Sequence, residues 1–120
     1  MNSAGVSLLL SRFLSAAPVR AAAGQSSDGQ FSWMDGEADE LDGEMLAALM
    51  GGALSDPEAL PWDLVDDVLQ RTTFEFDVET LYLYLVTQEF VLAAVTDQGL
   101  RADPLDQAVA EILSDLRQFV

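Results

Sequence analysis

Residues 74–95, FEFDVETLYLYLVTQEFVLAAV, are the most apolar stretch of the chain and contain no basic residue. Two patterns compete within this stretch. Phe74, Phe76 and Val78 alternate with polar residues, which is typical of a strand with one buried face. The segment LYLYLV is also rich in residues that favour strands, so a strand over part of 72–86 is one alternative.

The helical alternative rests on three features of the same stretch. Asp77 is a suitable N-cap, the apolar residues from Val78 to Val95 recur at helical spacing, and Gly99 supplies a stop. Continuous apolar runs of this length are usually helices. We therefore predict a helix over 77–97, preceded by an extended segment over 72–76.

Three further segments carry apolar residues at helical spacing, and we predict a helix in each: 37–50, 56–71 and 104–119. Gly51 ends the first segment, and Pro57 starts the second. Pro104 after an N-capping Asp103 starts the third. The four helices together predict an all-α fold, a small three- to four-helix bundle in which 77–97 is the central helix.

The first 27 residues contain no acidic residue, whereas the rest of the chain carries 21. This sharp change in composition predicts a disordered N-terminal tail. The alternatives are an organellar transit peptide and a non-classical export leader, because acid-free segments with Arg and Ser are typical of both. We divide the chain into a disordered or targeting segment with its linker, 1–36, and an acidic helical domain, 37–120. The expected location is cytoplasmic unless the leader acts.

The net charge is -16, from 21 acidic residues and five arginines. Such a surface repels nucleic acids and anionic membranes, because both are bound through Lys and Arg. A transmembrane helix needs about 18 or more consecutive apolar residues, and Glu79 and Glu89 interrupt the best candidate. The expected partner is therefore a protein, either basic or with an apolar groove.

The chain contains no His and no Cys. Zinc sites with thiolate or imidazole ligands, Ser-His-Asp catalysis and Cys-His catalysis are therefore excluded. The acidic run 35–44 does not match a calcium loop, because Glu40 and Leu46 occupy the positions that need Gly and a carboxylate. The adjacent acids Asp66 and Asp67 do not predict a catalytic pair. We expect no enzymatic activity, no cofactor and no metal.

Two groups of apolar residues are candidates for partner binding. Aromatic residues interleaved with acids, followed by a marginal helix, suit a segment that folds into a partner's groove, although such a helix is also typical of a core. Large side chains on 77–97 that the other helices leave uncovered would form a contact patch. The candidates are Phe31, Trp33, Leu41, Met45, Tyr82, Tyr84 and Phe90.

These observations predict a non-catalytic, acidic helical module for protein–protein interaction. Such a module would serve as an adaptor or a chaperone-like subunit of a larger assembly, for example a secretion apparatus, and a self-complementary patch would make it a homodimer. One alternative is an acidic inhibitor or antitoxin that mimics nucleic acid and covers a basic surface. Another is a small subunit imported into an organelle.

Overall fold

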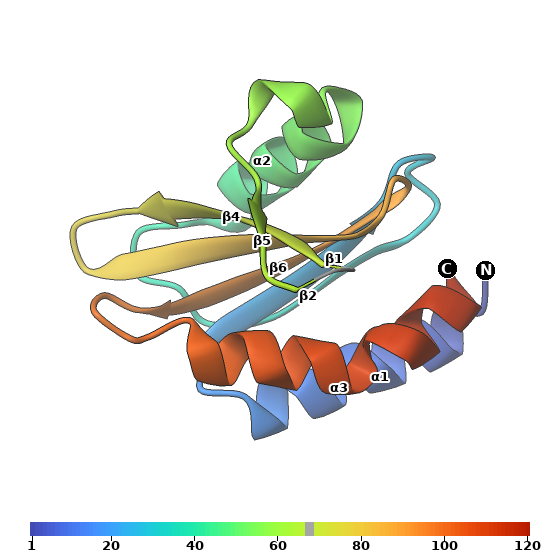
Figure 1. Ribbon diagram of the computed structural model, residues 1–120, viewed down its shortest axis with the longest axis horizontal. Helices are drawn as coiled ribbons and strands as arrows, with labels where there is room; N and C mark the ends of the chain where they lie inside the picture. Colours follow the sequence, from blue (N-terminus) through green and yellow to red (C-terminus); the bar gives the residue numbers. More distant parts are fainter. Residues whose placement is uncertain (67–68) are drawn as a thin grey trace.

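In the part of the chain that the structure describes, six antiparallel strands and three α-helices form an α/β fold, so the predicted all-α bundle is wrong. A computed structural model describes residues 1–66 and 69–120 (Figure 1). In this part of the chain the sheet has the strand order β2-β1-β6-β5-β4-β3. The elements are α1 (Ser3–Ala16), β1 (Ala21–Ser26), β2 (Ser32–Gly36), α2 (Gly43–Ser55), the 3-10 turn η1 (Pro57–Ala59), β3 (Asp63–Leu64), β4 (Gln70–Glu75), β5 (Glu79–Thr87), β6 (Phe90–Asp97) and α3 (Asp103–Phe119).

Strands β5 and β6 replace the predicted helix over 77–97. Side chains alternate between the two faces of a strand. Tyr82 and Tyr84 of β5 pack in the cluster under α1 and α3, whereas Leu81 and Leu83 pack in the cluster under α2. Because both faces are covered, neither strand has a polar side, and the sequence is continuously apolar, as it would be in a buried helix.

The turn between β5 and β6 also carries no strong sequence signal. Thr87 pairs with Phe90, so Gln88 and Glu89 alone connect the two strands. Tight hairpin turns are usually marked by Gly, Asn or Asp, none of which is present in this turn. Two strands of nine and eight residues therefore look, in the sequence, like one long helix.

The N-terminal segment belongs to the core, which corrects the predicted disordered tail. Helix α1 buries Val6, Leu10 and Phe13 against one face of the sheet. Strand β1 lies between β2 and β6, and its small residues pair with Ala93 and Ala94 of β6. The change of composition after residue 27 thus falls between two paired strands and separates no tail from a domain.

The remaining predicted elements have mixed outcomes. The helix over 104–119 is confirmed as α3, and the extended segment over 72–76 corresponds to β4. The helix over 37–50 is shifted: it starts only after Asp42, whose side chain caps it, and runs to Ser55. The helix over 56–71 is wrong where the structure describes it, because that segment contains η1, β3 and the start of β4; residues 67 and 68 lie outside the described residues.

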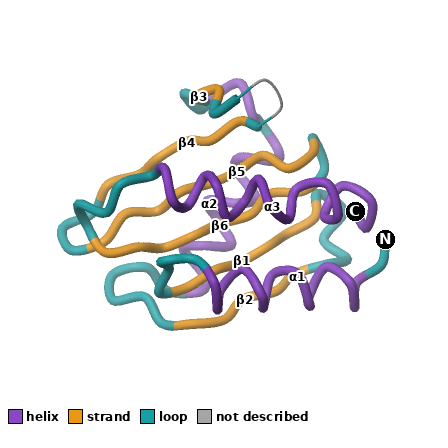
Figure 2. The backbone as a smooth tube through the Cα atoms, turned by 60° about the horizontal axis from the view of Figure 1, so that its bottom comes forward, coloured by secondary structure: helices purple, strands orange, loops and turns teal. Residues whose placement is uncertain are grey.

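The layers are stacked with the sheet in the middle. Helix α2 covers one face, and α1 and α3 lie side by side on the other (Figures 1 and 2). The two ends of the chain are close together, since the amide of Asn2 donates to the carbonyl of Phe119 at 2.8 Å. In the described part of the chain, no helix is both long and apolar enough to cross a membrane.

Two core substitutions test whether both faces of the sheet are packed. Leu83→Ala removes a fully buried side chain on the α2 side, and Leu92→Ala removes one on the α1–α3 side. Each should lower the free energy of unfolding by about 2–5 kcal/mol in urea titrations, because each leaves a cavity. The matched control is Leu64→Ala, since Leu64 is 65% exposed and should change stability by only about 0.5 kcal/mol. A near-neutral effect of either core variant would contradict the two-layer core.

Candidate functional site

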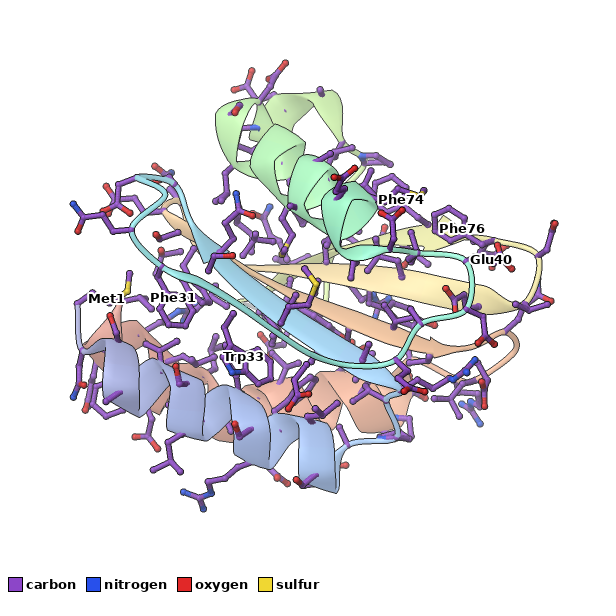
Figure 3. All side chains as sticks on the ribbon, turned by 180° about the vertical axis from the view of Figure 1, so that it is seen from behind. Met1, Phe31, Trp33, Glu40, Phe74 and Phe76 are labelled. Carbon is purple, nitrogen blue, oxygen red and sulfur yellow. The ribbon has the colours of Figure 1, made fainter. Side chains whose placement is uncertain are left out.

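The structure places most of the predicted contact residues in the core. Trp33 is half-buried between β2 and α1 (Figure 3), and Met45 of α2 is 41% exposed. The other predicted residues are at most 6% exposed, and all but one of them lie in the cluster under α1 and α3: Phe31, Leu41, Tyr82, Tyr84 and Phe90. These buried side chains hold the molecule together and offer no surface to a partner.

Tyr84 anchors α3 to the sheet. Its hydroxyl donates to the Asp106 carboxylate at 2.6 Å, and Arg71 forms an ion pair with the same carboxylate. Burial raises the pKa of Tyr84 well above its ordinary value, and the hydrogen bond to Asp106 acts in the same direction. The phenol therefore stays protonated and serves as a structural donor, not as a reactive group.

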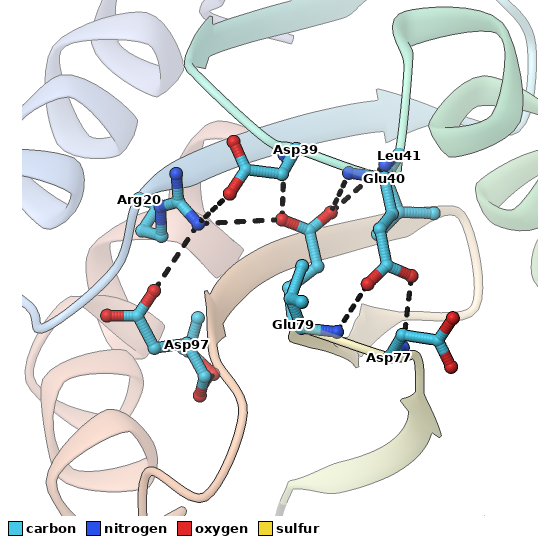
Figure 4. Close-up of polar contacts among 9 residues, drawn as sticks. Arg20, Asp39, Glu40, Leu41, Asp77, Glu79 and Asp97 are labelled. Carbon is cyan, nitrogen blue, oxygen red and sulfur yellow. Dashed lines mark hydrogen bonds and ion pairs between the residues drawn. The ribbon is translucent and has the colours of Figure 1, made fainter.

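A pair of carboxylates clasps the loop before α2 to the turn between β4 and β5 (Figure 4). Glu79 is fully buried, and its two oxygens accept from the amides of Asp39, Glu40 and Leu41 at 2.8, 2.8 and 3.0 Å. In return, the Glu40 carboxylate accepts from the amides of Asp77 and Val78. A buried charge is tolerated only when hydrogen bonds compensate its lost hydration, and the three amides supply that compensation.

Arg20, the residue immediately before β1, completes this clasp. Its guanidinium lies 2.8 Å from Asp39, 3.3 Å from Asp97 and 3.8 Å from Glu79. The hydrogen bond from Arg20 lowers the pKa of Asp39 below its ordinary value. Gly36 has a positive φ of 91°, a conformation that favours glycine, and there the chain turns from β2 toward the loop. The clasp thereby fixes where α2 begins.

The outer face of α2 is exposed but nearly free of charge. Of the 13 residues in α2, only Glu44 is charged, whereas Leu46, Met50 and Ala53 face the sheet. Exposed helix faces normally carry charged or polar residues. We define the α2 surface by six residues: Met45, Ala48, Leu49, Gly52, Leu60 and Phe74. All of them except Met45 line an apolar groove of about 220 Å³, to which β4 contributes Phe74.

The edge of the sheet beside the α2 surface is only partly covered. Strand β3 pairs with β4 at two positions, Asp63 with Arg71 and Leu64 with Gln70. Residues 72–75 of β4 pair with β5 on one side and, among the described residues, with no strand on the other. Backbone groups on such an edge can pair with another chain. Phe74 and Phe76 lie on the α2 side of this strand (Figure 3).

Sequence analysis missed most of the α2 surface and the whole clasp. The signal for the first was present: residues 45–55 contain no charge in a chain of net charge -16. The clasp left no comparable signal in the sequence. Each hydrogen bond between its two carboxylates and the backbone amides joins residues that are separated by 37 to 40 positions along the chain. Across the described residues, no group of three or more acidic side chains is arranged to hold a metal ion.

Comparison with known proteins shows the fold. No family model and no curated protein matches the chain. Among solved structures, Myxococcus xanthus MglB is 16% identical with a TM-score of 0.69, covering 94% of this chain and 92% of that one. The roadblock/LC7 domain from Streptomyces avermitilis is 17% identical with a TM-score of 0.59, covering 94% and 95%. An MglB described with a tetrameric arrangement is 13% identical with a TM-score of 0.66, covering 98% and 89%.

These similarities define the class of the fold. The six-stranded sheet with helices on both faces is an α/β architecture of the roadblock/LC7 type. Because all three identities are low, the similarity establishes the fold and leaves activity and partners to be argued from the site.

The clasp is tested by Glu79→Gln. Gln replaces one carboxylate oxygen with an NH2 group, which is a donor. This NH2 group would face backbone N–H groups that are also donors, so at least one buried hydrogen bond is lost. We expect the free energy of unfolding in urea to fall by about 1–3 kcal/mol, with faster hydrogen exchange at residues 39–41. Glu89→Gln in the exposed β5–β6 turn removes the same charge and is the control. Unchanged exchange at 39–41 would show that Glu79 does not hold the loop.

Proposed function

We propose that this chain is a non-catalytic protein-interaction module, an adaptor subunit that self-associates through the α2 surface. The second copy would cover the outer face of α2 and reach the neighbouring groove. The finer assignments, such as a role in secretion, remain hypotheses within this adaptor class.

The observation that supports this proposal is the lack of charge on an exposed helix. Two copies of a chain with net charge -16 repel each other over most of their surfaces. At the α2 surface they bring few carboxylates together, because residues 45–55 are uncharged and Asp56 is the single acid among the residues that line the groove. Ala48 has a small side chain and Gly52 has none, so a second helix can approach closely.

The groove beside α2 strengthens the case for a protein partner. Leu49, Leu60 and Phe74 are each partly buried, and they line a space of about 220 Å³ that can accept an apolar side chain. Exposed apolar surfaces of this kind typically mark sites of protein interaction. The similarity to an MglB with a tetrameric arrangement also favours self-association.

The absence of catalysis in this proposal rests on chemistry. The chain has no His and no Cys, which removes the commonest bases and nucleophiles. The buried carboxylate of Glu79 accepts hydrogen bonds from three backbone amides, and the partly buried carboxylate of Asp106 is held by Tyr84 and Arg71. Neither group is free to transfer a proton to a substrate.

A basic protein that binds an acidic surface of this chain is the second candidate. The exposed acids Asp77 and Asp97 lie at the clasp (Figure 4), and the exposed Glu37 is next to it, since its amide donates to the carbonyl of Arg20 at 3.1 Å. A partner attracted by these charges would bind more weakly as salt is raised, because salt screens exposed charges. Salt would not weaken self-association through the α2 surface in this way, because salt screens the repulsion between two acidic copies, so a salt titration separates the two candidates.

The substitution Ala48→Glu tests the α2 surface. Ala48 is exposed on a helix, so Glu fits the fold, but a second copy would bury its charge without a partner. We expect the dissociation constant for self-association to rise by at least about tenfold in sedimentation-velocity experiments, which corresponds to about 1.4 kcal/mol. Gln30→Glu adds the same charge in the exposed β1–β2 loop and should leave the constant unchanged. Equal self-association by both variants would disprove the proposed surface.

A further inference from the structure

A second groove lies on the opposite side of the molecule, between α1 and α3. These helices pack side by side under the sheet (Figure 2), and the groove between them has a volume of about 190 Å³. Its accessible apolar lining is formed by Ala16, Ala108 and Ile112, above the buried side chains of Leu9 and Phe13. Charged side chains border it on both sides: Arg12 belongs to α1, and Glu111 and Asp115 belong to α3.

Among the described residues, the three charged side chains at this groove have no ion-pair partner. All three are exposed, and none forms an ion pair within residues 1–66 and 69–120. Helix α1 contains no acidic residue at all, whereas the α3 side of the groove is acidic. The two walls of the groove thus carry opposite charges. Leu8, one turn before Arg12 on α1, is 61% exposed.

This distribution of charge is self-complementary. A twofold axis along the groove places α1 of one copy over α3 of another. Because Arg12 borders the same groove as Glu111 and Asp115, it would then face these two acids of the partner subunit. The same contact forms a second time with the roles of the copies exchanged. Leu8 would be covered in the process.

We propose that the groove between α1 and α3 is a self-association surface for a second copy of this chain. Arg12 of each copy pairs with Glu111 and Asp115 of the partner subunit, around a centre formed by the apolar groove lining. A second copy fits better than an acidic or a basic partner, because only a surface with both signs of charge satisfies both walls. Two acidic copies repel each other over most of their surfaces. This repulsion is weaker at helix α1, because α1 contains no acidic residue.

This surface is independent of the α2 surface. Helices α1 and α3 lie on one face of the sheet and α2 on the other (Figure 1). One copy can therefore use both surfaces at once. Two different twofold contacts on opposite faces would join dimers into larger assemblies.

Exchange of the charges tests the proposal. Arg12→Glu places like charges opposite each other when two copies of this variant meet, and the double variant Glu111→Arg with Asp115→Arg does the same. Each variant alone should self-associate at least about tenfold more weakly at physiological salt. An equimolar mixture should form a heterodimer, because both contacts in a mixed pair then join opposite charges. Sedimentation velocity and native mass spectrometry, with one variant isotopically labelled, measure both effects.

The background and the controls keep this test separate from the proposed function. All variants carry Ala48→Glu, so association through the α2 surface does not contribute, whether or not that surface acts in the wild type.

Arg101→Glu makes the same change of charge at an exposed loop residue and should leave association unchanged. Recovery in the mixture also shows that the variants fold. The proposal is overturned if the Ala48→Glu parent is monomeric at about 100 μM, a weak association on the usual scale. It is equally overturned if the mixture associates no better than each variant alone.

Discussion

The rest of the structure depends on one constraint: strands β5 and β6 are apolar on both faces and must be covered on both. Leu81, Leu83 and Val91 need a layer on one side, and Tyr84 and Leu92 need a layer on the other. The chain supplies both layers from its own helices, α2 above and α1 with α3 below (Figure 1). The covered faces of β5 and β6 therefore require no external partner, and an interaction must use other surfaces, such as the α2 surface to which Phe74 of β4 contributes.

An acidic chain uses part of its charge to build this fold. Glu79 and Glu40 act as acceptors for backbone amides in segments far apart in sequence, and Arg20 joins the same network (Figure 4). Backbone amides in an irregular loop have no neighbouring strand that accepts their hydrogen bonds. Here the carboxylates accept these hydrogen bonds, as side chains do for backbone donors outside regular elements. The result is a fixed path from β2 into α2, so that the position of the α2 surface is set by the core.

In the proposed assembly, the remaining acids limit where two copies can meet. Most exposed faces are rich in carboxylates and would repel a second copy, but two surfaces differ. One is the outer face of α2, which is uncharged after Glu44, and the other is the α1–α3 groove, where Arg12 opposes Glu111 and Asp115. The two surfaces depend on different interactions. Burial of apolar side chains does not rely on charge, whereas salt weakens the pairing of exposed charges. Their positions on opposite faces make an assembly with two kinds of contact geometrically possible.

The sequence alone determined the features that depend on local chemistry. Asp103 and Pro104 at the start of an amphipathic segment were enough to predict α3, and the alternation around Phe74 was enough to predict an extended segment at β4. The same holds for the exclusion of His and Cys chemistry, which follows from composition alone. Only the tertiary structure decided the rest. A strand covered on both faces has the composition of a buried helix, so β5 and β6 could not be recognised by period alone. Likewise, β1 forms a strand because it pairs with β6. Glu79 acts in the clasp because the fold brings the backbone amides of residues 39–41 within hydrogen-bond distance of its carboxylate.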